Sequence, residues 1–406
     1  MSMSTSINEH PILAQVVLGY SPMIDRERAV TATRLTVFPV RPDAPLDAGA
    51  LLAAVAQVWP EAGGKVSLNV LSETLLTDLL QARPSANLML EVPAFMACNV
   101  AHSASIQALY ARGNTLLIKG RPRADLPRDV LPCFKHSIID VEDERRTEST
   151  APAGVVRGIT HVQSGVRSML ELNAAFKRGA VAVLGWPIDD VMRPDGAGQV
   201  HSDWSTIVEL MRRIDREEPI DRLEETLRLD PTLAFKLLRY INSPAFGLRV
   251  VVGSFRHALM LLGYTRLKRW LAVLLASASK DRDMKPVMFA ALRRGLLMEE
   301  LARTSGGAAD EQMRNEAFIC GVFSLLDQLL QQPFSELLGS VPVPERVQQT
   351  LRGDAGPYAP YLDLIRAIEQ ESVYDIRECS ERLMLGPAEV NRALLVALHS
   401  ARLLDG

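Results

Sequence analysis

The chain has 406 residues, of which 48% are hydrophobic and 23% are charged. This composition is typical of a folded globular protein and excludes extensive disorder, and the length favours two domains because single cores stop growing at about 250–300 residues. The formal net charge of −3 provides no overall attraction to nucleic acid or to anionic lipid.

Short apolar runs and scattered cysteines indicate the compartment. The longest apolar runs, such as Leu271–Ala276, are far shorter than the roughly 20 residues that a membrane span needs. No C-x-x-C pair and no secretory leader are found, so we expect reduced thiols and a cytoplasmic protein without a membrane partner. The cysteines are Cys98, Cys133, Cys320 and Cys379.

From residue 12 to residue 188, β-rich runs alternate with helical runs. We predict strands at 12–20, 34–40, 65–70, 87–93, 115–120, 136–142, 155–162 and 180–188, and helices at 46–59, 72–82, 105–113 and 166–179. Such alternation is typical of βαβ units around a parallel sheet, and this number of units predicts a TIM-like α/β barrel. About 185 residues is short for eight complete units.

After a polar, glycine-containing segment at 189–200, the pattern changes to helical spacing. Asp230-Pro231 predicts a helix start, Asn242–Pro244 predicts its end, and a further helix is predicted from Tyr264. The fold class is therefore α/β plus all-α, with a barrel domain at 10–190 and a helical domain at 201–406.

Two sets of motifs identify a family resemblance. The barrel half carries VTATRLTVF (30–38), SLNVLSETLL (67–76), NLMLEVP (87–93), TLLIKG (115–120), HSIIDVE (136–142), GITHVQSGV (158–166) and VLGWPI (183–188). The helical half carries LRLDPTLAFKLLRYINSPAFGL (227–248) and SFRHALMLLGYTRLKRWLAVL (254–274). In this order the pieces resemble a divergent EAL domain, from the barrel family that hydrolyses cyclic di-GMP, joined to an HDOD domain, a helical relative of HD phosphohydrolases.

The EAL resemblance implies that most catalytic positions are substituted. Asn69 and Glu91 match metal-binding residues of the family and Asp140 matches a family acid, whereas the other positions carry Arg34 for a glutamate, Lys119 and Gly120 for an Asp pair, Ile138 for a lysine, and Thr160 and Gln163 for two glutamates. Two-metal hydrolysis needs several converging carboxylates, and three ligands are too few. The resemblance thus implies no catalytic residue, no metal and no cofactor.

The HDOD resemblance rests on three motifs, carried by Leu227, Asp230, Pro231, Leu233, Asn242, Ser243, Ala245, Ala258, Leu262 and Gly263. Ser324 and Leu325 stand where an active HD enzyme has its His-Asp dyad, and Asp327 lies on another side of the helix. The basic segment Arg266, Lys268 and Arg269 is either a patch for an acidic partner or a solvated helix surface, and we favour the latter. The stretch 379–404 resembles a helix-turn-helix, but we expect it to pack against the helical domain.

Two functional hypotheses follow. The favoured one is a non-catalytic bacterial signalling regulator, not an enzyme, that binds other proteins; neither cyclic di-GMP nor nucleic acid is expected as a partner. The alternative is a cyclic di-GMP-binding sensor or residual phosphodiesterase that uses the barrel mouth, because Asn69, Glu91 and Asp140 are retained together. In that case Arg34 or Lys119 could contact the nucleotide.

Overall fold

A computed structural model describes residues 10–122, 124–148, 159–189, 202–228, 255–277, 281–305 and 311–405. These residues form two compact units, described separately below. The first unit contains residues up to 190 together with 366–381 and 386–392, and the second contains 191–365, 382–385 and 393–406. Within the described part of the chain, no helix has both the length and the apolar character needed to cross a membrane.

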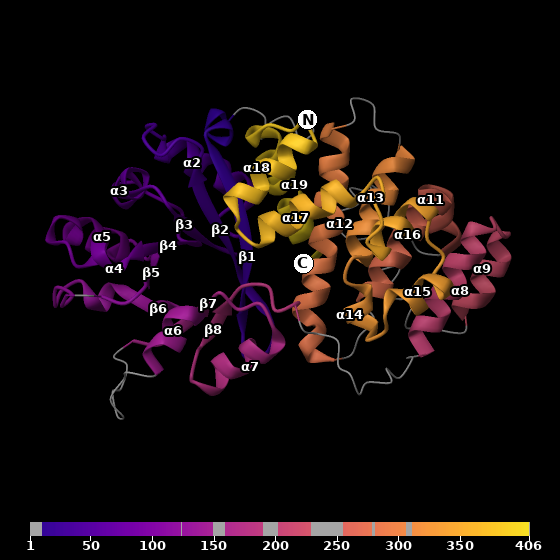
Figure 1. Cartoon of the computed structure of the whole chain (residues 1–406), viewed down its shortest axis with the longest axis horizontal. Coiled ribbons are helices and arrows are strands. Elements are labelled where there is room, and N and C mark those ends of the chain that lie inside the picture. The colour runs from indigo at the N-terminus through magenta and orange to yellow at the C-terminus, as the bar shows by residue number, and fades with distance from the viewer. Residues whose placement is uncertain are drawn as a thin grey trace. The chain divides into compact units, whose positions relative to one another are not determined.

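The first unit contains a closed barrel of eight strands in sequential order (Figure 1). The prediction of an α/β barrel is therefore confirmed, with all eight strands in place. The strands are β1 (Val16–Asp25), β2 (Val30–Pro39), β3 (Lys65–Val70), β4 (Leu88–Pro93), β5 (Thr115–Lys119), β6 (Phe134–Asp140), β7 (His161–Ser164) and β8 (Ala182–Leu184).

One strand runs against the other seven. β1 pairs antiparallel with both β2 and β8, and every other neighbouring pair is parallel. Only residues 26–29 link β1 to β2, which explains why a short chain can close the barrel: a hairpin needs no crossover helix. The predicted first strand at 12–20 begins instead with the 3₁₀ turn η2 (Pro11–Ala14).

Helices cover the outside of the strands that they connect. They are α2 (Ala48–Val58), α3 (Glu73–Gln81), α4 (Ala94–Ala97), α5 (Ser103–Ala111), α6 (Val141–Glu148) and α7 (Met169–Lys177), with 3₁₀ turns η3 (Val100–His102) and η4 (Leu131–Cys133). Polar N-caps start three of them, since the side chains of Asp47, Ser72 and Ser168 each accept a backbone N–H of the first turn. The loops that lead from the parallel strands into these helices lie at the carboxyl ends of the strands. This end is the mouth of the barrel.

The interior of the barrel is closed by an apolar layer. Strands other than β3 contribute buried side chains to it: Met23, Ala32, Met89, Leu117, Ile138, Val162, Ala182 and Leu184. Because side chains alternate between the two faces of a strand, the residue two positions further along also points inward. We call this apolar layer the floor. The next inward-facing side chains along the strands lie between the floor and the mouth.

The C-terminal part of the chain contributes to the first unit. Asn391, which is 1% exposed, donates to the carbonyl oxygens of Leu13 and Val16 at 2.8 and 2.7 Å and accepts the Leu18 N–H at 3.0 Å. The exposed Arg377 donates to the Val40 carbonyl at 2.9 Å. The structure thus differs from the expectation that the whole stretch 379–404 packs against the helical domain, because residues 386–392 bind the start of β1.

The second unit is helical. Its described elements are α8 (Ser202–Asp215), α9 (Ile220–Arg228), α11 (Phe255–Ala276), η6 (Arg282–Met284), α12 (Lys285–Ser305), α13 (Glu311–Phe323), α14 (Leu326–Leu330), α15 (Phe334–Ser340) and α16 (Glu345–Arg352). The helices α17 (Ala359–Glu369), α18 (Val373–Arg382) and α19 (Pro387–Asp405) contribute residues to both units. Gly263 interrupts α11 with a φ of 71°, as the predicted Leu-Gly turn requires. The Asp230-Pro231 start and the break at 242–244 lie outside the described residues.

Candidate functional site at the barrel mouth

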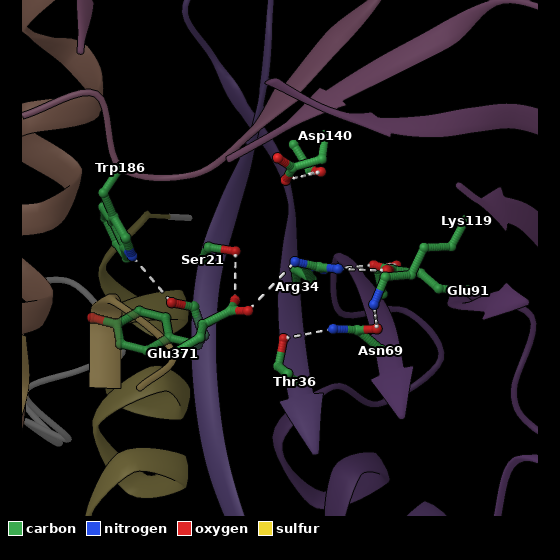
Figure 2. Close-up of polar contacts among 12 residues, drawn as sticks. Ser21, Arg34, Thr36, Asn69, Glu91, Lys119, Asp140, Trp186 and Glu371 are labelled. Carbon is green, nitrogen blue, oxygen red and sulfur yellow. Dashed lines mark hydrogen bonds and ion pairs between the residues drawn. The ribbon is translucent and has the colours of Figure 1, made fainter. Parts of the chain in front are cut away.

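A layer of polar side chains lies between the apolar floor and the mouth of the barrel, and Figure 2 shows the polar contacts among them. Each member stands two positions after a floor residue on the same strand and therefore faces the interior: Arg34, Glu91, Lys119, Asp140 and Ser164. Asn69 and Ser67 of β3 join them through hydrogen bonds. Five of the sequence-predicted positions thus come together here, namely Arg34, Asn69, Glu91, Lys119 and Asp140.

Arg34 and Glu91 form a buried, two-pronged ion pair. Arg34 Nε and Nη2 donate to the two carboxylate oxygens of Glu91, each at 2.8 Å. The Glu91 side chain is 0% exposed and that of Arg34 is 9% exposed, and Ser67 Oγ donates a further bond to Glu91 at 3.0 Å. Burial alone would lower the pKa of Arg34, but the charges of Glu91 and Glu371 more than offset it and raise that pKa above its usual value. Arg34 is therefore a permanent cation.

Lys119 is a second cation of the same layer, with different surroundings. Its Nζ donates to Asn69 Oδ1 at 2.8 Å, and Asn69 Nδ2 in turn donates to Thr36 Oγ1 at 3.2 Å. Among the described residues, no carboxylate forms an ion pair with Lys119. Burial, and then the nearby positive charge of Arg34, lower the pKa of Lys119 below its ordinary 10.5.

Asp140 lies at the end of β6 on the same face. Its Oδ2 accepts from Ser164 Oγ at 3.1 Å and its Oδ1 accepts from the Glu142 N–H at 3.0 Å. Asp140 thus caps the first turn of α6 as well as facing the polar layer.

Three of the sequence-predicted positions fall elsewhere. Ile138 belongs to the apolar floor. Thr160 precedes β7 at the opposite end of the barrel, where its Oγ1 lies 2.7 Å from His136 Nδ1. Gln163 is 0% exposed and donates to the Ile139 carbonyl at 2.8 Å, next to the inward-facing Val162, so it points out of the barrel. The structure therefore places Ser164, rather than Thr160 or Gln163, in the polar layer. Gly120 follows Lys119 with a φ of 82°, which favours glycine.

A glutamate from the C-terminal segment completes the layer and has no counterpart in the sequence prediction. Glu371 Oε2 lies 3.5 Å from Arg34 Nη1, and Glu371 Oε1 accepts from Ser21 Oγ at 3.1 Å (Figure 2). A separation of 337 residues between Glu371 and Arg34 leaves no local pattern from which this contact could be predicted. The serines and threonine, Ser21, Thr36, Ser67 and Ser164, were also missed, although the period-2 alternation could have indicated them.

The donors of this layer do not fit a divalent metal centre. Both oxygens of Glu91 bind the Arg34 guanidinium, and the oxygen of Asn69 binds the Lys119 ammonium. Hard divalent ions need several free oxygen ligands, and here the guanidinium and the ammonium already occupy these oxygens. The described residues also contain no group of three or more His, Cys, Asp or Glu side chains that could hold an ion.

An arginine also lies beside the dyad position of the helical unit. Ser324, which is 8% exposed, accepts a hydrogen bond from Arg294 Nη1 at 3.1 Å and donates to the Gly321 carbonyl at 2.8 Å. Leu325 is 2% exposed and packs in the core. The buried Arg294 guanidinium thus lies beside the position at which an active HD enzyme has its metal ligands.

The basic segment of α11 pairs with acidic residues of the same unit. Arg266 forms an ion pair with Glu311 at 3.7 Å, and Lys268 forms one with Asp215. Arg269 donates to both oxygens of Glu299 at 2.7 and 2.6 Å and lies over the Phe318 ring. These pairs neutralise the patch and agree with its interpretation as an ordinary helix surface.

Comparisons with known proteins match one segment of the chain to a domain model and larger parts of it to two curated bacterial proteins. Residues 202–332 match the HDOD domain model. The chain is 26% identical over 223 residues to the uncharacterized protein YuxH of Bacillus subtilis, covering 53% of each protein, and 28% identical over 176 residues to the cyclic di-GMP phosphodiesterase CdgJ of Vibrio cholerae, covering 43% of this chain and 40% of CdgJ. The chain thus spans about half or less of these curated relatives.

Among solved structures, one similar protein is Bacillus subtilis YkuI, which has an EAL domain and was determined with its substrate cyclic di-GMP and calcium. The TM-score is 0.31 at 12% identity, and the match covers 71% of this chain and 74% of YkuI.

Two sequence predictions are contradicted by these comparisons. The prediction that the chain is not an enzyme is contradicted because CdgJ, a relative, is a cyclic di-GMP phosphodiesterase. The prediction that cyclic di-GMP is not a partner is contradicted by the same relative, which is named for its action on that dinucleotide. The family resemblance is confirmed for the helical half, because residues 202–332 match the HDOD domain model, and the N-terminal half has the expected closed barrel.

Proposed function

We propose that this chain is a cyclic di-GMP signalling protein that binds the dinucleotide at the mouth of its barrel. The observation that carries the proposal is Lys119, a partly buried ammonium whose hydrogen bond goes to the neutral amide of Asn69. Burial of the ammonium and the positive charge of Arg34 lower the pKa of Lys119 by more than the carboxylates Glu91, Glu371 and Asp140 raise it, so the charged form of Lys119 is incompletely stabilised. An anion that enters the mouth would compensate that charge.

A cyclic dinucleotide has the chemistry that this mouth can recognise. Its two phosphodiesters carry one negative charge each, and Lys119 retains donors beyond the one that Asn69 accepts. Phe95, in α4 directly after β4, is 63% exposed and offers an aromatic ring near the same end of the barrel for base stacking. The similarity to CdgJ supports a cyclic di-GMP ligand among the anions of this class.

Calorimetric titration of cyclic di-GMP, in Mg²⁺, in Mn²⁺ and in EDTA, tests the proposal. The Lys119→Met variant should bind about tenfold or more weakly than the wild type, because it loses one charge-assisted hydrogen bond. Lys135→Met is the matched control: Lys135 is exposed near the amino end of β6, away from the mouth, and its loss should change affinity less than twofold.

Chromatography of the same mixtures reports the fate of the ligand. Accumulation of the linear dinucleotide would assign hydrolysis to the chain, and recovery of intact ligand would assign sensing. A wild-type protein that gives no binding heat in any of the three buffers and no product would refute the proposal.

A further inference from the structure

The turn between α17 and α18 delivers a carboxylate to the polar layer of the barrel. Within the first unit, Glu371 Oε2 lies 3.5 Å from Arg34 Nη1 and its Oε1 accepts from Ser21 Oγ at 3.1 Å. The Glu371 side chain is 19% exposed, so solvent weakens this pair only in part. Figure 2 shows the carboxylate between the Ser21 hydroxyl and the guanidinium.

The contact occupies the one edge of Arg34 that Glu91 leaves available. Nε and Nη2 already bind Glu91 in a two-pronged arrangement, and Nη1 faces Glu371. Arg34 and Glu91 together carry no net charge, so Glu371 makes this corner of the layer negative. A ligand phosphate that approaches Arg34 therefore meets a carboxylate in the position that the phosphate itself would take.

Backbone geometry shows that the glutamate is held in place against local preference. The last turn of α17 ends in a Schellman motif, with the Ser372 N–H bonded to the Ala367 carbonyl and the Glu371 N–H bonded to the Ile368 carbonyl. The residue at this C′ position has a left-handed conformation and is usually glycine, yet here it is Glu371 with a φ of 55°.

The partner strand carries the glycine instead. A Cβ on Gly19 of β1 would lie 3.0 Å from Glu371 Cγ and 3.3 Å from the Ile368 carbonyl oxygen, so the absence of a side chain at Gly19 permits the close approach of the turn. Glycine on the strand and glutamate on the turn both serve to bring the carboxylate to Arg34.

We infer that Glu371 is a tethered competitor of the ligand phosphate, so that binding of an anionic ligand at Arg34 displaces the 366–381 segment from the barrel. This inference rests on the proposed function and adds its regulation: the occupancy of the mouth and the docking of the C-terminal segment become linked equilibria. By reciprocity, anything that pulls the segment away from the barrel strengthens ligand binding by the same factor.

The test is a calorimetric titration of cyclic di-GMP into the full-length wild type, Glu371→Gln and Glu378→Gln. Glu371→Gln keeps the size of the side chain and removes its charge, and we expect it to bind about tenfold more tightly than the wild type. Glu378 is exposed on α18, so Glu378→Gln removes the same charge from the same segment and should stay within twofold of the wild type.

Hydrogen exchange measured with and without cyclic di-GMP gives a second readout. Ligand binding to the wild type should speed exchange in residues 366–381, and this acceleration should be smaller in Glu371→Gln, whose segment is already less firmly held. Equal affinities of the wild type and Glu371→Gln, with unchanged exchange in 366–381, would overturn this inference and leave the proposed function standing. Failure of both proteins to bind would overturn both.

Discussion

Replacing Arg34 by methionine tests whether the polar layer is held together by a buried ion pair. Methionine has a similar length but no charge, so the substitution leaves the carboxylate of Glu91, with a side chain that is 0% exposed, facing only the hydroxyl of Ser67 and the Lys119 side of the layer. Removal of one partner from a buried ion pair costs about 3–5 kcal/mol, because the remaining charge stays desolvated. We expect Arg34→Met to destabilise the barrel by this amount.

The double variant separates the pair from its desolvation. Arg34→Met combined with Glu91→Leu removes both charges, and replacement of a buried pair by apolar residues is often neutral, so its deficit should fall to within about 1–2 kcal/mol of the wild type. Arg167→Met is the surface control. Arg167 and Asp189 form a 2.8 Å pair with both side chains 49% exposed, and such pairs contribute less than about 1 kcal/mol.

Hydrogen exchange of the β2–β5 amides measures these effects, because exchange under native conditions reports the opening free energy of the barrel itself. We expect Arg34→Met to lower the opening free energy strongly and the double variant to recover most of this loss. If Arg34→Met costs no more than Arg167→Met, or if the double variant is no more stable than Arg34→Met, then the buried pair does not organise the layer.

Two further predictions concern Lys119 and Asn391. An anionic ligand binds the protonated form of Lys119, and burial and the charge of Arg34 hold the pKa of Lys119 below 10.5. The affinity for cyclic di-GMP should therefore decline with rising pH at values where exposed lysines remain charged. In a calorimetric pH series, Lys119→Arg should remove this decline. Without ligand the sign is reversed: between the lowered pKa and 10.5 the unfolded chain binds the extra proton, so the stability contribution of Lys119 increases with pH. Asn391→Ala leaves the Leu18 N–H and two buried carbonyls without their partner, each at a cost of about 1–3 kcal/mol, and should lower the thermal midpoint and speed exchange at the start of β1. A loss below about 1 kcal/mol would contradict that assignment.

In the polar layer, cationic side chains bind oxygen donors at positions where the EAL resemblance implies metal ligands. Arg34 and Lys119 bind oxygen donors, Glu91 and Asn69, that match metal-binding residues in the EAL resemblance. In the helical unit, Arg294 donates to Ser324, which stands at the position of the HD dyad. In both units a positively charged side chain thus satisfies buried oxygen atoms.

Local pattern in the sequence determined much of this protein. Strand–helix alternation predicted the barrel, because hydrophobic periodicity and strand pleating act over a few residues. The EAL resemblance, and not this periodicity, selected Arg34, Asn69, Glu91, Lys119 and Asp140. The resemblance also selected Thr160 and Gln163, which lie outside the polar layer. A one-residue shift in a short strand turns a side chain from one face of the sheet to the other, and nothing local specifies the register of a four-residue strand.

Only the tertiary structure decided which partners these side chains meet. The sequence identified Arg34 as a substitution but could not show that it binds Glu91 on β4, or that Glu371, 337 residues away, approaches its remaining edge. Closure of the barrel and docking of the 366–381 segment bring these charges together, and both depend on contacts between residues distant in the chain. Whether two charges pair depends on the distance between them in space. The sequence predicts that distance only where the backbone between the two groups is short and regular.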